Sequence, residues 1–290
     1  VDTTRRVTAS LASFRVMCDE LSRVLNHLLT MSAICLDLGS MGPVFWAFEE
    51  RELIMTVFEY LSGARMHTAL YRPFSLGCGV DVGVVTPAVL NLVQRGARVI
   101  NGAFVTLLSN RAFKSRASHI GAFSPLKIKA YGVSGVIARA SGVCVDARLG
   151  LGAPSYASYP TTSLRTFLGR RGDVYDRFLL RVREVITSYD VILASLASLS
   201  HTNTELARRS KFASMEGVIS HFRRASAGYV SSRGFAMSAI EGPKGFVGVA
   251  LVAGGDVSPY RLHVRSPVAH NLHLLTSQCN GQTFADFVST

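Results

Sequence analysis

The apolar side chains between Tyr175 and Leu196 recur at steps of three and four residues without a break. This spacing places them along one face of an α-helix, and Asp173 before them is a residue type that caps helix N-termini. Asp176 follows in the first turn, where a carboxylate interacts favourably with the helix dipole. A helix of this length must bury its apolar face against other elements, so the sequence predicts a helical core.

A second helical pattern lies near the start of the chain, where apolar residues recur from Leu11 to Leu28. This helix is predicted to end near Gly39. Polar side chains lie between the apolar ones and are expected on the opposite face: Asp19, Glu20, Arg23 and Asn26.

A third helix is predicted to start at Pro43, which suits the first helical turn, and to stop at Gly63. Its acidic residues are expected to form a solvated or ion-paired face: Glu49, Glu50 and Glu52.

The rest of the chain changes character twice. A helix is expected from about 87 to 108, with an interruption near Gly96 or Gly102, and residues 109–160 predict loops and short elements. A short helix at 214–224 precedes a buried strand at 246–253 and a half-buried strand at 260–265. The predicted fold is therefore mostly α: a helical bundle core over residues 1–200 with an irregular insert around 109–170, and a small α+β part over 201–290.

The charge balance is strongly basic, with 31 Lys and Arg against 19 Asp and Glu and a net charge of +12. Residues 61–145 hold ten basic side chains and one acidic side chain. This stripe favours either a solvated basic surface or an anionic partner. No uncharged apolar run reaches the roughly 18 residues of a membrane helix, so none is predicted.

The chain carries no self-contained catalytic or metal motif. Its five cysteines are widely spaced without a CxxC pair, which argues against a disulfide framework and against zinc or iron–sulfur ligation. Gly77–Gly83 misses the dinucleotide spacing, and no Walker or GxSxG motif occurs. A C-terminal group has no zinc-finger spacing and predicts no metal: His263, His270, His273 and Cys279.

One carboxylate lies in apolar surroundings, Asp37 within residues 33–39. If it is buried it needs a partner or a raised pKa; otherwise it is a solvated residue at the end of a helix.

Several short motifs are spread over nearly the whole chain, at residues 25–27, 37–39, 45–52, 62–67, 171–177, 214–216, 221–222, 243–245, 259–261 and 269–270. Taken together, these motifs resemble the forty-nine-kilodalton subunit of respiratory complex I, a relative of the nickel–iron hydrogenase large subunit. They occur in the family's order with similar spacing.

The resemblance implies a hydrogenase large-subunit-like fold and a core subunit of mitochondrial NADH:ubiquinone oxidoreductase, lying in the peripheral arm on the matrix side of the inner membrane. It implies that Asp37 takes part in proton chemistry at the quinone headgroup, paired with a histidine. It also implies that His67, with Arg65 as a weaker candidate, lies near a 4Fe–4S cluster. The chain is expected to bind no cofactor by itself, since the small iron–sulfur subunit holds the cluster and both subunits form the ubiquinone cleft.

The chain also departs from the family pattern. The family's N-terminal region, which supplies a quinone-contacting His and Tyr, has no counterpart here, so the sequence is expected to be a fragment. Either a separate chain, from a split gene, supplies that region, or the sequence is truncated. The other partners implied are peripheral-arm and membrane-arm subunits, with no nucleic acid. The main alternative is a basic RNA-associated or mitoribosomal protein, although no RNP, KH or zinc-knuckle motif occurs. An active hydrogenase would need paired cysteines, which are absent.

Overall fold

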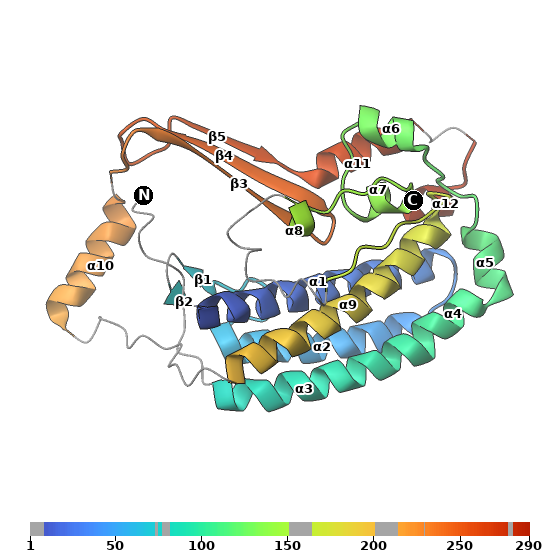
Figure 1. Ribbon diagram of the computed structural model, residues 1–290, viewed down its shortest axis with the longest axis horizontal. Coiled ribbons are helices and arrows are strands. Elements are labelled where there is room, and N and C mark those ends of the chain that lie inside the picture. Colours follow the sequence, from blue (N-terminus) through green and yellow to red (C-terminus); the bar gives the residue numbers. More distant parts are fainter. Residues whose placement is uncertain are drawn as a thin grey trace.

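The computed structural model describes residues 9–72, 75–76, 82–150, 164–200, 214–228, 230–277 and 281–290. Its long helices pack side by side into a bundle (Figure 1). Helix α1 packs against α9 and α2, and α3 packs against α2 and α9. This arrangement confirms the predicted mostly helical fold with a helical core. The bundle helices are α1 (Ala9–Asp37), α2 (Gly42–Ser62), α3 (Val82–Val99) and α9 (Val174–Ser200).

The interior of the bundle is filled by the apolar faces that the periodicity predicts. Leu21 and Leu28 of α1 and Phe178 of α9 are fully buried, and Phe178 contacts the ring of Phe113 edge-on. Full burial of such a side chain contributes roughly 1.5–3 kcal/mol. The apolar face predicted for α9 is wider than the part of the helix surface that is buried, since Ile186 is partly exposed.

The two predicted glycine stops end helices α1 and α2. Gly39 has φ +87° and follows the last turn of α1, and Gly63 has φ +76° and donates its N–H to the carbonyl of Glu59 at 2.7 Å. Both residues adopt the left-handed conformation that glycine reaches without steric cost. Helix α9 begins as predicted, because Asp173 Oδ1 accepts the backbone N–H of Asp176 at 2.8 Å.

Helix α3 begins before Pro87 and continues into a π-helical turn, η1 (Ile100–Phe104), and then α4 (Val105–Ser109). The predicted interruption therefore coincides with Gly102. Gly96 has another role, since a Cβ atom there would lie 2.2 Å from the Tyr189 hydroxyl of α9. The absence of a side chain at Gly96 allows α3 and α9 to approach closely.

Short elements follow the bundle's third helix, as predicted for the irregular segment. A two-stranded hairpin connects α2 to α3. The hairpin strands are β1 (Tyr71–Arg72) and β2 (Ser75–Leu76), and the short helices after α4 are α5 (Arg111–Ala117), α6 (Pro125–Ala130), α7 (Val136–Ala140) and α8 (Ala147–Gly150).

The C-terminal part contains a three-stranded antiparallel sheet in the order β3-β4-β5, which extends above the bundle in Figure 1. Strand β3 was not predicted from the sequence. Ser134 Oγ accepts the backbone N–H of Phe246 at 2.9 Å and anchors the β3–β4 hairpin. The elements are α10 (Met215–Ala227), β3 (Gly234–Gly242), β4 (Gly245–Ala253), β5 (Arg261–Arg265), α11 (Pro267–Thr276) and α12 (Phe284–Ser289).

The predicted burial of these strands is wrong. Strand β4 is only partly buried along most of its length, and Leu262 and Val264 of β5 are each 54% exposed. In the described part of the chain, only the hairpin end of the sheet is closely packed, because it alone reaches the 134–135 segment and α11. The division of the chain at residue 200 stays a prediction.

Three acidic or basic side chains predicted on polar helix faces are instead buried: Glu20, Arg23 and Glu50. Glu50 is ion-paired to Arg95 at 3.2 Å, and Glu49 and Glu52 are exposed and also ion-paired, so the solvated or ion-paired face predicted for α2 is confirmed except for the burial of Glu50. No helix in the described ranges is long and apolar enough to cross a membrane.

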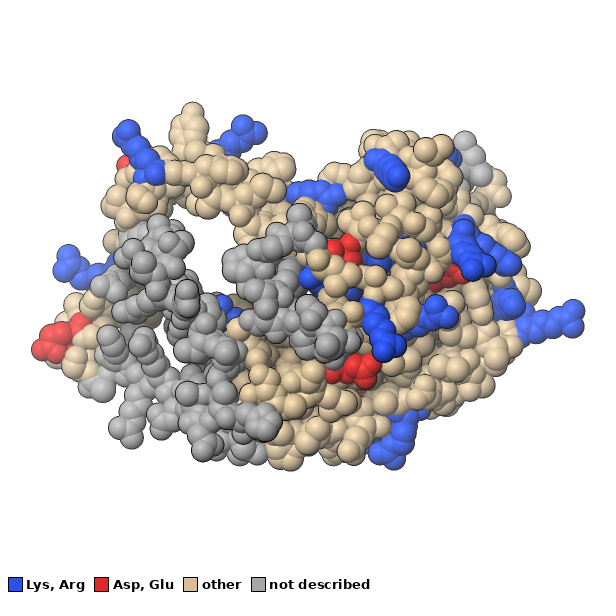
Figure 2. All heavy atoms as spheres, viewed as in Figure 1, with Lys and Arg blue, Asp and Glu red and all other residues tan. Residues whose placement is uncertain are grey.

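The basic side chains are visible on the face of the molecule drawn in Figure 2. On this face, Lys and Arg side chains are spread over both the bundle and the C-terminal part, and few Asp and Glu side chains lie between them. The surface of this face is therefore basic over a wide area and carries no single compact patch.

Candidate functional site

Asp37 is the last residue of α1 and is half-buried. The helix ends there because the N–H groups of Leu38, Gly39 and Ser40 turn back to the carbonyls of the last helical turn. Burial raises the pKa of the Asp37 carboxyl, and no described residue forms a hydrogen bond or ion pair with that carboxyl. The negative end of the helix dipole also disfavours a carboxylate at this position. Asp37 is therefore suited to hold a proton that a neighbouring base could accept.

Arg65 and His67 lie in the turn that follows α2. Ser62 shapes the start of this turn, because its hydroxyl accepts the N–H of Ala64 at 3.2 Å. Arg65 forms an ion pair with Glu52 and lies 3.9 Å from Glu59. The His67 side chain is exposed and has no partner among the described residues. Its imidazole is thus accessible to a neighbouring molecule.

The far end of this turn is anchored to the bundle. Leu70 is buried in the core, and the Tyr71 hydroxyl donates to Asp19 Oδ1 at 2.6 Å. Burial raises the pKa of Asp19 to about 6, although the hydrogen bond from Tyr71 opposes this shift. The segment that carries Arg65 and His67 is therefore fixed at both ends.

The structure does not bring the predicted residues into one cluster. Asp37 precedes α2 and Arg65 and His67 follow it, and a helix of 21 residues is about 30 Å long. Figure 1 shows the two ends of α2 at opposite sides of the bundle. Asp37 and His67 therefore belong to separate regions of the surface.

A network of buried charges lies between the bundle and the C-terminal sheet. Its centre is Glu184 of α9, whose Oε2 is 3.0 Å from His27 Nε2 and whose Oε1 accepts from Arg139 Nε at 3.0 Å. Arg139 Nη1 also donates to Glu241 of β3 at 2.9 Å.

Burial disfavours a charged Glu184, but Arg139 and His27 hold the pKa of its carboxyl far below the usual range. Burial lowers the pKa of His27 to about 4. The imidazole is therefore neutral at pH 7 and donates its Nε2–H to Glu184.

The network continues toward α8. Glu20 accepts from Arg23 Nε at 3.2 Å and from the Ser188 hydroxyl at 2.6 Å. Arg148 Nη1 lies 3.6 Å from Glu20, and its Nη2 donates to Asp146 at 2.8 Å. Removing one partner from such a group leaves an uncompensated buried charge, which costs about 3–5 kcal/mol. The network therefore fastens α7, α8 and β3 to the bundle.

Comparison with known proteins identifies the family. The family model described as "Respiratory-chain NADH dehydrogenase, 49 Kd subunit" matches residues 37–290. The NADH-ubiquinone oxidoreductase 49 kDa subunit of Paramecium tetraurelia is 35% identical over 98% of this chain and 75% of its own length. The chain belongs to this 49 kDa subunit family. The subunit of the same name from Nyctotherus ovalis is 35% identical over 95% of the chain and 68% of its own length. The one from Prototheca wickerhamii is 33% identical over 95% of the chain and 70% of its own length.

Membership of the 49 kDa subunit family confirms the resemblance inferred from the motifs and gives no support to the RNA-associated alternative. The roles of Asp37, Arg65 and His67 stay predictions. Among the described residues, no three His, Cys, Asp or Glu side chains converge as metal ligands. Cys279 and most of the segment 77–83 lie outside the described residues.

The buried network was not predicted from the sequence. Its members come from distant segments, and none has a local motif. One signal was present: Glu20, Arg23 and His27 follow one another at helical spacing and lie among the apolar positions of α1. Charged residues on the apolar side of a helix indicate buried partners elsewhere in the chain.

Proposed function

We propose that this chain acts as a core peripheral-arm subunit of mitochondrial NADH:ubiquinone oxidoreductase and forms one wall of the quinone-reduction cleft. The observation that carries the proposal is the 35% identity over 98% of the chain to a 49 kDa subunit of NADH-ubiquinone oxidoreductase. Electrons from NADH would arrive through other subunits, so the chain is not catalytically competent alone.

Asp37 is proposed to exchange a proton during quinone reduction. Its carboxyl is half-buried at a helix end, has a raised pKa and has no partner in the described chain. A histidine beside it would complete an acid–base pair there. A raised pKa makes the carboxyl hold a proton more readily than a solvated aspartate does.

His67 is proposed to lie beside the 4Fe–4S cluster held by the adjacent small iron–sulfur subunit, with Arg65 nearby. A positive charge close to a cluster favours its reduced state, and a protonated imidazole carries such a charge. The exposed His67 side chain supports such a contact. Arg65 is already paired with Glu52 and Glu59, so its charge is partly balanced.

The proposed partners are the small iron–sulfur subunit and other peripheral-arm and membrane-arm subunits. The Paramecium and Nyctotherus subunits are longer than the matched region, which spans 75% and 68% of them. The proposed location is the matrix side of the mitochondrial inner membrane.

The test is Asp37→Asn in the assembled complex. NADH-dependent quinone reduction should fall at least tenfold, while assembly on native gels and NADH oxidation by a water-soluble acceptor stay unchanged. Asp190→Asn, at an exposed position of α9, is the matched control and should leave all three measurements unchanged. Normal quinone reduction in an assembled Asp37→Asn complex would refute the proton role.

A further inference from the structure

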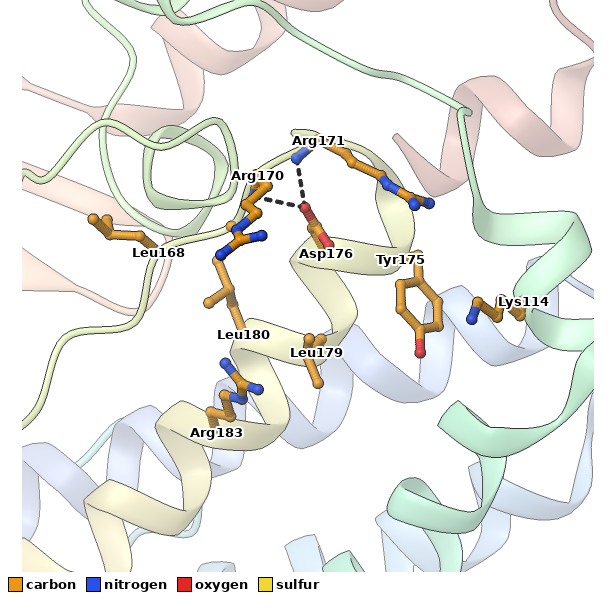
Figure 3. A pocket seen from close by; sticks show the side chains of 10 residues that line it. Lys114, Leu168, Arg170, Arg171, Tyr175, Asp176, Leu179, Leu180 and Arg183 are labelled. Atoms are coloured by element: carbon orange, nitrogen blue, oxygen red, sulfur yellow. Dashed lines mark hydrogen bonds between the residues drawn. The ribbon is translucent and has the colours of Figure 1, made fainter.

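A pocket of about 320 Å³ lies beside the first turns of α9 (Figure 3), and its lining includes neither Asp37, Arg65 and His67 nor a member of the buried network. Its walls come from three segments: α5, the chain before α9, and α9 itself. Four of its lining residues are basic: Lys114, Arg170, Arg171 and Arg183. The volume lies within the usual range for small-molecule sites.

The positive charge of the pocket is not balanced by its own residues. Asp176 is the one acidic lining residue, and its Oδ2 already accepts the backbone N–H groups of Arg170 at 3.0 Å and Arg171 at 2.8 Å. Asp176 thus shapes the turn before α9. None of the four basic side chains forms an ion pair with a described carboxylate.

Two of these cations are oriented by aromatic rings. Lys114 Nζ lies 5.9 Å from the centre of the Tyr175 ring, and the Arg183 guanidinium lies 5.5 Å from the centre of the Phe167 ring. Figure 3 shows Lys114 directed toward Tyr175, and Arg170 and Arg183 on either side of Leu180. The pocket therefore holds oriented donors around an apolar surface.

The apolar part of the lining distinguishes this pocket from a simple anion site. Leu168, Leu179 and Leu180 line it together with the Tyr175 ring. Guanidinium groups recognise phosphate oxygens through paired N–H donors, whereas the leucines favour a carbon-rich body. We propose that the pocket binds a small phosphate ester with an apolar portion. The headgroup region of an anionic phospholipid and a soluble phosphate ester share this chemistry.

The first test measures binding to the full chain by calorimetry, with dihexanoylphosphatidic acid and inorganic phosphate as probes. The ester should bind at least tenfold more tightly than inorganic phosphate. Arg170→Gln/Arg183→Gln should weaken ester binding at least tenfold. The matched control, Arg116→Gln at an exposed position of α5, should change it less than twofold.

A second variant guards against misfolding. Arg170→Lys/Arg183→Lys keeps both charges but removes the paired donors. Its affinity for the ester should therefore lie between those of the wild type and the double glutamine variant, with an unchanged circular dichroism spectrum. The proposal is overturned if the wild-type chain prefers inorganic phosphate, if the glutamine variant binds like wild type, or if Arg116→Gln loses as much.

The second test separates the two sources of ligand. Mass spectrometry of the purified native complex should find either a phospholipid in the organic extract or a phosphate ester in the aqueous extract, and Arg170→Gln/Arg183→Gln should remove it. Neither compound, or one retained by the variant, contradicts the proposal. Asp37→Asn should keep the ligand, so this inference and the proposed quinone role can fail separately.

Discussion

The helical bundle and the β3–β5 sheet bury the same kinds of side chain to different extents. Leu28 of α1 is fully buried, whereas Leu262 of β5 is 54% exposed. Even charged groups are deeply buried in the bundle, where Glu184 is 2% exposed. An apolar pattern thus defines which face of a helix or strand prefers burial, while burial itself requires another helix or sheet packed on that face. In the bundle the helices cover one another's apolar faces, whereas the described part of the sheet is covered only at its hairpin end.

The largest expected effect lies at the centre of the bundle's network. Glu184→Ala removes one of the two carboxylates that are hydrogen-bonded to Arg139 and should lower the free energy of unfolding by about 3–5 kcal/mol, measured by urea denaturation. Glu52→Ala removes an exposed partner of Arg65 and should cost less than about 1 kcal/mol. Equal costs for the two variants would break the contrast between buried and surface charge.

A pH dependence should follow from His27. Its folded pKa of about 4 lies below the ordinary 6.5, so between these values the unfolded chain binds more protons. The free energy of unfolding should therefore fall as the pH is lowered from about 6.5 to about 4, by about 3 kcal/mol. The measurement is the difference in pH slope between wild type and His27→Gln, whose amide can still donate to Glu184. Identical slopes would show that His27 titrates normally in the folded chain.

The contact between α3 and α9 should be less costly to disturb. Gly96→Ala places a methyl group against the Tyr189 ring and should lower the free energy of unfolding by about 1–3 kcal/mol. Gly102→Ala meets nothing within 4 Å and should be neutral or stabilising by less than about 1 kcal/mol. Thermal unfolding of both variants tests this, and a loss at Gly102 as large as at Gly96 would contradict the close packing.

The smallest effect is expected in the sheet. Leu262→Ala should change the free energy of unfolding by less than about 1 kcal/mol, because about half of the side chain is already in water. The same substitution at Leu28 should cost about 2–5 kcal/mol. Urea denaturation of the full chain compares them directly. A large cost at Leu262 would mean that the chain itself covers this face.

The features predicted correctly from the sequence are those that depend on neighbouring residues. Asp173 and Gly63 mark helix ends because capping is local, and the apolar stripe of α9 predicts its buried face. Strand β3 was missed because its pairing with β4 depends on residues that the local pattern does not contain. The motif turns with Asp37, Arg65 and His67 were found from family spacing. The network around Glu184 could not be assembled, since Arg139 and Glu241 are 102 residues apart.

The late position of Glu241 in the chain has a consequence for biosynthesis. Arg23 donates to the Glu241 carbonyl across 218 residues, so a nascent chain completes most of its bundle before this partner leaves the ribosome. During that interval Arg23 and Arg139 stay hydrated, because dehydrating them without Glu241 is unfavourable. Water therefore leaves the surroundings of these two arginines only when the β3–β4 hairpin docks. Folding should end with this docking, and the chain should rely most on chaperones during the last stage of its synthesis.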